Sequence, residues 1–202
     1  MNSGKRFEQN FKKSVPNNIF FYRFRDGTAN WQHNDLVRFQ QKNICDCMIF
    51  DGEILLLLEL KSHKGKSLPL SCIRDNQIKE LSLNQIYKNV KCGIVINFEE
   101  LSECYFMFIC DITDFIRKSD RKSIPIDYCR EKGIKIANKR LRTNYKYDIT
   151  EMIKEVKEMV WMLFLNILVL IFEVLYYSMF MHFLQWNSKK RLISLLNAPL
   201  DK

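Results

Sequence analysis

The sequence predicts an α/β protein with a mixed central sheet flanked by helices and an appended long, apolar C-terminal helix. Two observations predict this fold class. Apolar runs of strand length alternate with segments of helical periodicity, and residues 159–184 are almost continuously apolar. At 202 residues the chain is long enough to bury a substantial core. We expect one domain over residues 1–158 and an apolar helical tail over residues 159–202.

The N-terminal segment predicts a helix and then a strand. An apolar side chain recurs every four positions from Phe7 to Val15, which predicts a helix over residues 3–15. Pro16 ends this helix because proline cannot continue the backbone hydrogen bonding. The aromatic, β-prone run that follows predicts a first strand over residues 19–25.

A polar segment, residues 26–41, follows the first strand and predicts a long loop or protrusion. Long structured loops in compact domains are often functional. Arg23 and Arg25 precede the loop and Trp31 lies within it. Basic and aromatic groups together suit a contact with nucleic acid. A solvated loop without a partner fits the same composition.

The next stretch predicts a β-hairpin. Asp51-Gly52 is a strong turn signal, and it separates two apolar runs at residues 44–50 and 53–61. These runs are the expected second and third strands. Because the strands are strongly apolar, any charged side chain on them is costly to bury and has to be explained.

Three ionisable side chains on this hairpin are candidates for chemistry. Asp46 lies in the first run, while Glu59 and Lys61 end the second, where strand alternation directs both to the same face. Two carboxylates on adjacent strands can hold a hard divalent cation. A lysine beside that cation can stabilise a phosphate or help to activate water, as in metal-assisted phosphodiester hydrolysis. The alternative is a hairpin that ends in a solvated Asp46 and a Glu59–Lys61 ion pair.

A basic loop is expected directly after these residues, at positions 62–70. Together with Lys61, its residues Lys64 and Lys66 bring three lysines near the expected phosphate. Backbone amides and lysines of such a loop position a phosphodiester without reading its sequence.

The rest of the chain predicts further helices and strands. A helix is expected over residues 74–90, with Gln77 in its first turn. Two strands and two short helical segments follow, at residues 91–98, 104–110, 111–117 and 123–132. This order of elements is typical of a mixed sheet with helices on its faces.

The charge distribution indicates a polyanionic partner. The net charge is +9, of which +7 falls in residues 1–158, and such a balance is typical of proteins that meet nucleic acid or anionic membranes. Residues 130–146 are the most basic run and include Lys139, Arg140 and Arg142. We favour a phosphate-binding patch there over a merely solvated surface.

The cysteines indicate the compartment. The sequence has seven cysteines, an odd number, and no Cys-x-x-Cys pair. Most lie in apolar runs, which predicts buried, reduced thiols. A disulfide-rich secreted protein is thereby excluded, and we expect a cytoplasmic protein.

The ionisable and small residues along the chain, taken together, resemble the PD-(D/E)xK nuclease superfamily, and more narrowly the RecU-type Holliday junction resolvases. The resemblance covers about residues 3–157. It is carried by Gly4-x-x-Phe7-Glu8, Asp46, Glu59-x-Lys61, the run from Leu58 to Leu70, Gln77-Ile78-x-x-Leu81, and the strand opened by Gly93. It implies a restriction-endonuclease-like mixed sheet.

The resemblance also implies a role for each residue of the motif. Asp46 and Glu59 would be ligands of Mg²⁺ or Mn²⁺, and Lys61 would orient or activate the attacking water. Glu8 would complete the acidic cluster, although a solvated helix acid is the simpler interpretation. Gln77 would support the site from its helix. The residues expected to contact DNA are Arg23, Arg25, Lys64, Lys66, Lys139, Arg140 and Arg142.

The assembly implied by the resemblance is a symmetric homodimer. Each subunit would nick one strand of a four-way DNA junction, and residues 26–41 lie where the family has a stalk that enters the junction. Two other functions fit the same sequence. One is another PD-(D/E)xK nuclease, of the restriction or phage DNA-processing type. The other is a non-catalytic DNA-binding protein held at a membrane by residues 159–184.

The apolar tail has three interpretations: a membrane anchor, a dimerisation or packing helix, and a tail foreign to the family. It is long enough for a span, because about 20 apolar residues suffice. Trp161 and Trp186 are aromatics of the interfacial type, but Glu173 near the middle argues against a simple span. A span would also place the basic residues 189–191 outside, against the positive-inside tendency. Membrane association is therefore not the favoured interpretation.

Overall fold

The computed structural model describes residues 3–24 and 43–196, and the chain divides into two compact units, Met1–Val156 and Lys157–Lys202. In the described part of the first unit, six strands form a mixed sheet with the order β1-β2-β3-β5-β6-β8. Of its neighbouring pairs, β3 and β5 run parallel and the others antiparallel. The strands are β1 (Phe20–Arg23), β2 (Cys47–Phe50), β3 (Leu55–His63), β5 (Val90–Phe98), β6 (Glu103–Phe108) and β8 (Ile134–Lys135). The predicted mixed sheet is confirmed.

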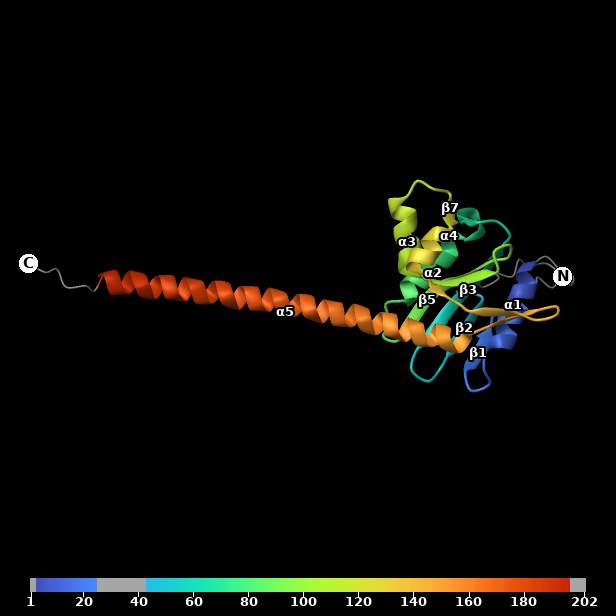
Figure 1. The fold of residues 1–202 in the computed structure, drawn as a ribbon, viewed down its shortest axis with the longest axis horizontal. Coiled ribbons are helices and arrows are strands. Elements are labelled where there is room, and N and C mark those ends of the chain that lie inside the picture. Colours follow the sequence, from blue (N-terminus) through green and yellow to red (C-terminus); the bar gives the residue numbers. More distant parts are fainter. Residues whose placement is uncertain (1–2, 25–42, 197–202) are drawn as a thin grey trace, which may run out of the picture. The chain divides into compact units, whose positions relative to one another are not determined.

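Helices cover both faces of this sheet (Figure 1). On one face, α1 packs against β3 and against the short strand β10 (Tyr145–Tyr147); on the other, α2 and α3 pack against β5 and against each other. The crossover from β3 to β5 includes α2, as a parallel pair requires. The helices are α1 (Ser3–Ser14), α2 (Asp75–Asn84), α3 (Ile109–Lys118), α4 (Ile126–Lys132) and α5 (Ile149–Leu196).

One hydrophobic core lies between the sheet and the layer of α2 and α3. Its fully buried members include Leu81, Ile94, Ile96, Phe98, Met107 and Ile112, which come from α2, β5, β6 and α3. Gly93 is required in β5, because a Cβ there would lie 2.4 Å from both the carbonyl oxygen of Met107 and the ring of Phe106. This packing fixes β5, and β5 in turn holds the neighbouring strand β3.

The hairpin of β2 and β3 is confirmed, but its loop is longer than the expected two residues. Phe50 pairs with Leu55, so four residues connect the strands. Asp51 Oδ1 accepts hydrogen bonds from the amides of Glu53 (3.0 Å) and Ile54 (2.9 Å), and Gly52 has a φ of +100°. The side chain of Asp51 therefore shapes the turn, and β3 begins two residues later than expected.

The helix predicted over residues 74–90 is longer than the observed helix, α2. Helix α2 ends at Asn84, whose side-chain amide donates to the carbonyl oxygen of Glu80 at 2.8 Å. Asn89 adopts a φ of +62°, and Val90 already begins β5. Ile86, expected on the apolar stripe of the helix, is 77% exposed. Apolar residues at helical spacing continued past the real helix end and produced the error.

Two small sheets lie beside the main one. β4 (Ser67–Pro69) pairs with β7 (Ser123–Pro125), and a 3₁₀ turn at Leu70–Cys72 follows β4. The expected basic loop at residues 62–70 is therefore largely strand. The expected short helices at 111–117 and 123–132 correspond to α3, which begins at Ile109, and to β7 followed by α4. β9 (Asn138–Arg140) pairs with β10 (Tyr145–Tyr147) and forms a hairpin within the basic run.

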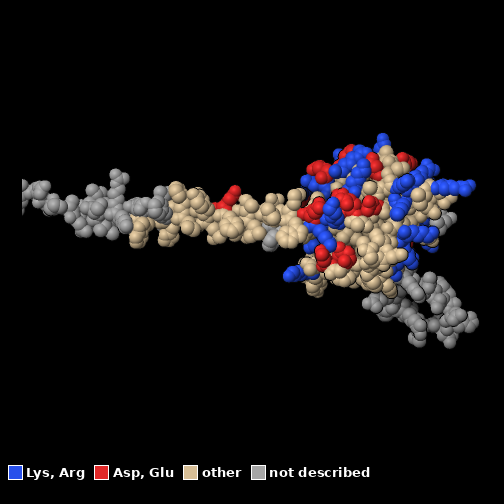
Figure 2. Space-filling model, turned by 60° about the horizontal axis from the view of Figure 1, so that its bottom comes forward, with Lys and Arg blue, Asp and Glu red and all other residues tan. Residues whose placement is uncertain are grey.

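The second unit consists of the rest of α5. The helix begins at Ile149, directly after Asp148, whose Oδ1 accepts a hydrogen bond from the amide of Glu151 at 3.0 Å. Beyond residue 160, most of the described apolar side chains of this helix are exposed, and Figure 2 shows the coloured part of the tail as mostly uncharged surface. The stretch Ile149–His182 is long and apolar enough to cross a membrane by length and composition, a test that core helices of soluble proteins also pass. Arg25, residues 26–41 and residues 197–202 lie outside the described residues.

Candidate active site

Residues Asp46, Glu59 and Lys61 come together at the paired strands β2 and β3. Asp46 stands one residue before β2, and its Oδ2 accepts a hydrogen bond from the amide of Leu60 at 2.8 Å. Its own amide donates to the carbonyl oxygen of Leu58 at 3.2 Å. Because these backbone contacts lie on both sides of Glu59, they hold the Asp46 carboxylate beside that residue.

Glu59 and Lys61 form an ion pair on one face of β3. The ammonium of Lys61 lies 2.8 Å from Glu59 Oε1, and the side chain of Glu59 is only 1% exposed, against 20% for Lys61. The predicted alternation of β3 therefore places both groups as expected. Burying a carboxylate beside one partly buried cation costs folding free energy, and such arrangements are typical of functional sites.

The environment of Glu59 changes its acidity. Burial raises the pKa of the carboxyl, and the negative charge of Asp46 raises it further, while the ammonium of Lys61 lowers it. The net effect is a pKa of about 7, compared with an ordinary value of 4.5. Near neutral pH the carboxyl is therefore close to its point of half-protonation, and a cation bound to it would displace a proton.

Gln77 connects this site to the first turn of α2. Its side-chain Oε1 accepts a hydrogen bond from the amide of Arg74 at 3.0 Å, and its Nε2 donates to Glu59 Oε1. The first contact fixes the orientation of the side-chain amide, so that its donor faces Glu59. Leu81, one turn further along the helix, is fully buried in the core. The helix is thereby anchored, and Gln77 holds Glu59 in place.

The donor set fits one hard divalent cation. Glu59 Oε2 is buried and has no hydrogen-bond partner among the described residues, whereas its Oε1 is occupied by Lys61 and Gln77. Leaving a buried carboxylate oxygen unsatisfied is costly. Magnesium is commonly held by one or two carboxylates and keeps several of its waters. The oxygens of Asp46 and Glu59 provide such a pair.

Glu8 does not join a three-carboxylate cluster in this structure. It forms an ion pair with Arg23, and no group of three or more His, Cys, Asp or Glu side chains suited to a metal exists in residues 3–24 and 43–196. Arg23 on β1 lies opposite Cys47, the neighbour of Asp46, so this ion pair lies close to the site. Glu8 and Arg23 thus neutralise each other at the margin of the site.

The other basic residues expected to contact DNA lie at two places. Lys64 and Lys66 are exposed between β3 and β4. Lys139 and Arg140 lie on β9, and Arg142 lies in the turn that leads to β10; all three are exposed. The two groups therefore belong to different elements, far apart in the sequence.

A buried polar network on the opposite face of β3 was not predicted. Ser62 Oγ donates to Glu99 Oε1 at 2.8 Å and accepts from Asn97 Nδ2 at 2.9 Å. The hydroxyl of Tyr147 donates to Asn97 Oδ1 at 3.4 Å, and the amide of Tyr147 donates to Ser14 Oγ at 2.9 Å. The polar Asn97 in an apolar strand was the available signal. The network connects α1 and β10 to the residue next to Lys61.

Three comparisons relate this chain to known proteins. The family model of Recombination protein U, RecU, matches residues 11–155. The SPbeta prophage-derived uncharacterized protein YotM of Bacillus subtilis (strain 168) is 31% identical over 170 residues, which span 76% of this chain and 86% of the relative. Hjc, a Holliday junction resolvase of Archaeoglobus fulgidus, has 14% identity and a TM-score of 0.45 over 65% of this chain and 95% of its own. The family match and the relative show that the chain belongs to the RecU family of recombination proteins.

Proposed function

We propose that the protein is a metal-dependent, structure-selective endodeoxyribonuclease that resolves Holliday junctions in DNA recombination and repair. One observation carries the proposal: Glu59 is buried beside Asp46 and Lys61, and its Oε2 has no partner among the described residues. Membership of a recombination-protein family supports DNA as the substrate. Two carboxylates and a lysine at one point of a strand suit phosphodiester hydrolysis.

Asp46 and Glu59 would hold one Mg²⁺ or Mn²⁺. Such an ion supplies Lewis-acid polarisation of a phosphoryl oxygen and lowers the pKa of a bound water. The contribution of the chain is to hold the two carboxylates in register. The amide of Leu60 fixes Asp46, and Gln77 fixes Glu59. Neither ligand then needs to reorganise when the substrate arrives.

Lys61 would act directly on the substrate. Its ammonium is partly exposed and lies at the edge of the carboxylate pair. From there it can hold the attacking water in line with the phosphorus and donate a hydrogen bond to the phosphoryl oxygens as negative charge develops on them. The ion pair with Glu59 keeps the lysine in place before the substrate binds.

The substrate would be contacted through positive charge on both sides of this site. Lys64 and Lys66 follow directly after β3, and Lys139, Arg140 and Arg142 belong to the β9–β10 region. We propose that two copies form a symmetric homodimer in the cytoplasm, so that each subunit nicks one strand of a four-way junction. A twofold arrangement matches the paired cleavage sites that such a junction offers.

The test is cleavage of a labelled synthetic four-way junction and of a matched linear duplex by the full-length protein. Reactions would contain Mg²⁺, Mn²⁺ or EDTA. Paired, symmetric nicks on the junction, dependent on metal, are the expected result. Equal cutting of the linear duplex would instead favour a nuclease of the restriction or phage DNA-processing type. Tight binding of the junction without cleavage in either metal would contradict the enzymatic proposal.

A further inference from the structure

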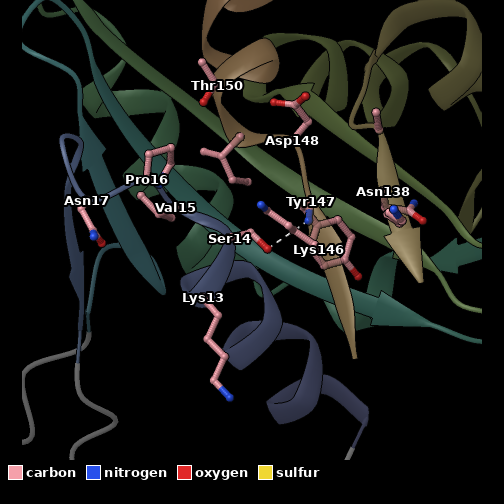
Figure 3. A pocket seen from close by; sticks show the side chains of 13 residues that line it. Lys13, Ser14, Val15, Pro16, Asn17, Asn138, Lys146, Tyr147, Asp148 and Thr150 are labelled. Atoms are coloured by element: carbon pink, nitrogen blue, oxygen red, sulfur yellow. Dashed lines mark hydrogen bonds between the residues drawn. The ribbon is translucent and has the colours of Figure 1, made fainter. Parts of the chain in front are cut away.

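A cavity of about 570 Å³ lies at the C-terminal end of α1 (Figure 3). The end of α1 forms one wall, the β9–β10 hairpin forms another, and the first residues of α5 close it. The residues important for its chemistry are Lys13, Asn17, Lys139, Lys146, Asp148 and Thr150. None of them belongs to the candidate active site.

The charge of this cavity is not compensated. Its three lysines, Lys13, Lys139 and Lys146, form no ion pair with a carboxylate of the described residues. The single acid of the lining, Asp148, accepts the amide of Glu151 at 3.0 Å and serves as the cap of α5. Several other cations among the described residues are paired with carboxylates instead.

Two other basic groups show the contrast. Arg130 is shared between Glu103 and Asp127, and Lys118 lies 2.7 Å from a carboxylate oxygen of Asp114. Because uncompensated lysines repel one another, a cavity lined by three of them is best occupied by an anion. The lining also offers the uncharged donors Asn17 and Thr150, which suit phosphate oxygens.

The floor of the cavity is connected to the strand that carries the candidate active site. Tyr147 lies in the lining; its amide donates to Ser14, and its hydroxyl donates to Asn97. Asn97 donates to Ser62, the residue after Lys61. Tyr147 is also buried between the rings of Phe7 and Phe11, with centroid distances of 5.4 and 6.3 Å. An anion bound here would therefore be held at a fixed position relative to β3.

We propose that this cavity binds a backbone phosphate of a DNA strand that is not cut, and so holds one arm of the substrate relative to Asp46 and Glu59. The inference rests on the proposed function, because it takes DNA as the ligand. A polymeric backbone is favoured over a small phosphate compound because the cavity adjoins an exposed basic hairpin. That hairpin carries Lys139, Arg140 and Arg142, which would continue along the same strand.

The test uses the full-length double variant Lys13→Ala/Lys146→Ala. Its matched control is Lys79→Ala/Lys88→Ala, which removes two exposed lysines on and after α2. Binding to a synthetic four-way junction and to a linear duplex would be measured in EDTA between 50 and 200 mM salt. Each lost phosphate contact lowers the slope of log K against log salt by about 0.9. Because the cavity is proposed to bind one phosphate, we expect the cavity variant to lower the slope by about 0.9 and the control to leave it almost unchanged.

Several outcomes would decide the question. A slope equal to that of the wild type, or an equal loss in the control, overturns the proposal. The variant Lys13→Arg/Lys146→Arg, which keeps the charge, should restore most of the affinity; failure to do so also counts against a phosphate site. Cleavage assays separate the two proposals. If no form of the protein cuts DNA while the slope changes as expected, the cavity proposal stands and the nuclease proposal fails.

Discussion

The charged residues of the candidate active site and those of the cavity at the end of α1 differ in burial and in ion pairing. At the first, Glu59 is almost completely buried, is paired with Lys61, and has its pKa raised to about 7. At the second, Lys139 and Lys146 are exposed and form no ion pair with a described carboxylate. A buried group with a shifted pKa is typical of a site that breaks bonds. Exposed lysines that contact phosphates release counterions from the DNA, and they therefore suit binding. This difference is the basis on which we propose bond breaking at the first region and substrate binding at the second.

The largest expected effect separates cleavage from binding. Asp46→Asn removes one of the two carboxylate charges while its amide oxygen can still accept from Leu60. We expect junction cleavage to fall by on the order of 10³-fold or more, with junction affinity unchanged within about twofold. Single-turnover cleavage and binding in EDTA would measure the two. If the variant cuts at the wild-type rate or fails to bind, the assignment of cleavage to the carboxylates and of binding to the cavity is wrong.

A second prediction concerns Lys61. Lys61→Ala removes the ammonium from the phosphate and should lower cleavage by roughly 10²- to 10³-fold. It also leaves Glu59 buried without its cation, so the pKa of that carboxyl should rise above its present value of about 7. The rate profile against pH would then shift toward higher pH in the residual activity. Lys79→Ala, at an exposed position on α2, is the control and should change neither the rate nor the profile.

The raised pKa of Glu59 also predicts how stability varies with pH. The folded state binds the proton more tightly than the unfolded state, in which the pKa is near 4.5. Stability from this group is therefore present below pH 4.5 and is lost as the pH rises through about 7, by roughly 3 kcal/mol at most. A divalent cation should restore it at pH 8 and have little effect at pH 5.

Urea unfolding at the two pH values, with and without Mg²⁺, measures this effect. The control is Glu59→Gln, which cannot titrate, so that the difference between wild type and variant isolates Glu59 from the other acids. A wild-type protein that gains as much stability from Mg²⁺ at pH 5 as at pH 8 would contradict the assignment of the raised pKa. Equal stabilisation of the variant would place the cation elsewhere.

A smaller effect is expected at Gln77. Gln77→Ala removes the donor to Glu59 and the acceptor for the amide of Arg74. Loss of a group that orients a metal ligand lowers activity by about 10- to 100-fold, and the lost hydrogen bonds cost about 1–2 kcal/mol of unfolding free energy. Cleavage rates and urea unfolding would be compared with those of Lys79→Ala. A loss of stability without a loss of rate would limit Gln77 to a structural role.

The smallest effect is expected from the tail. The family match ends at residue 155, and each residue of the candidate site and of the cavity lies in the first unit. A protein that ends at residue 158 should therefore cleave junctions in solution within about twofold of the full chain. A large loss of cleavage would show that the apolar helix contributes to the active assembly. Sedimentation of the full chain with lipid vesicles would separately test the membrane interpretation of the tail.

Local pattern was sufficient for the centre of the site but not for its surroundings. Side-chain alternation along β3 places Glu59 and Lys61 on one face, and the hairpin turn at Asp51 brings Asp46 beside them. Both features can be predicted from local sequence. The pairing of Glu8 with Arg23 depends instead on how α1 lies over the sheet. The contact between Ser14 and Tyr147 joins residues 133 positions apart. No periodicity in the sequence contains such information.

The most direct measurement of the central claim is single-turnover cleavage of a four-way junction as the concentration of Mg²⁺ is increased. Wild type and Glu59→Gln would be compared at saturating enzyme. If Asp46 and Glu59 hold the catalytic cation, the wild-type rate rises from zero in EDTA to a plateau, and the variant stays inactive at every concentration. Cleavage in EDTA, or a variant that reaches the wild-type plateau, would contradict this account.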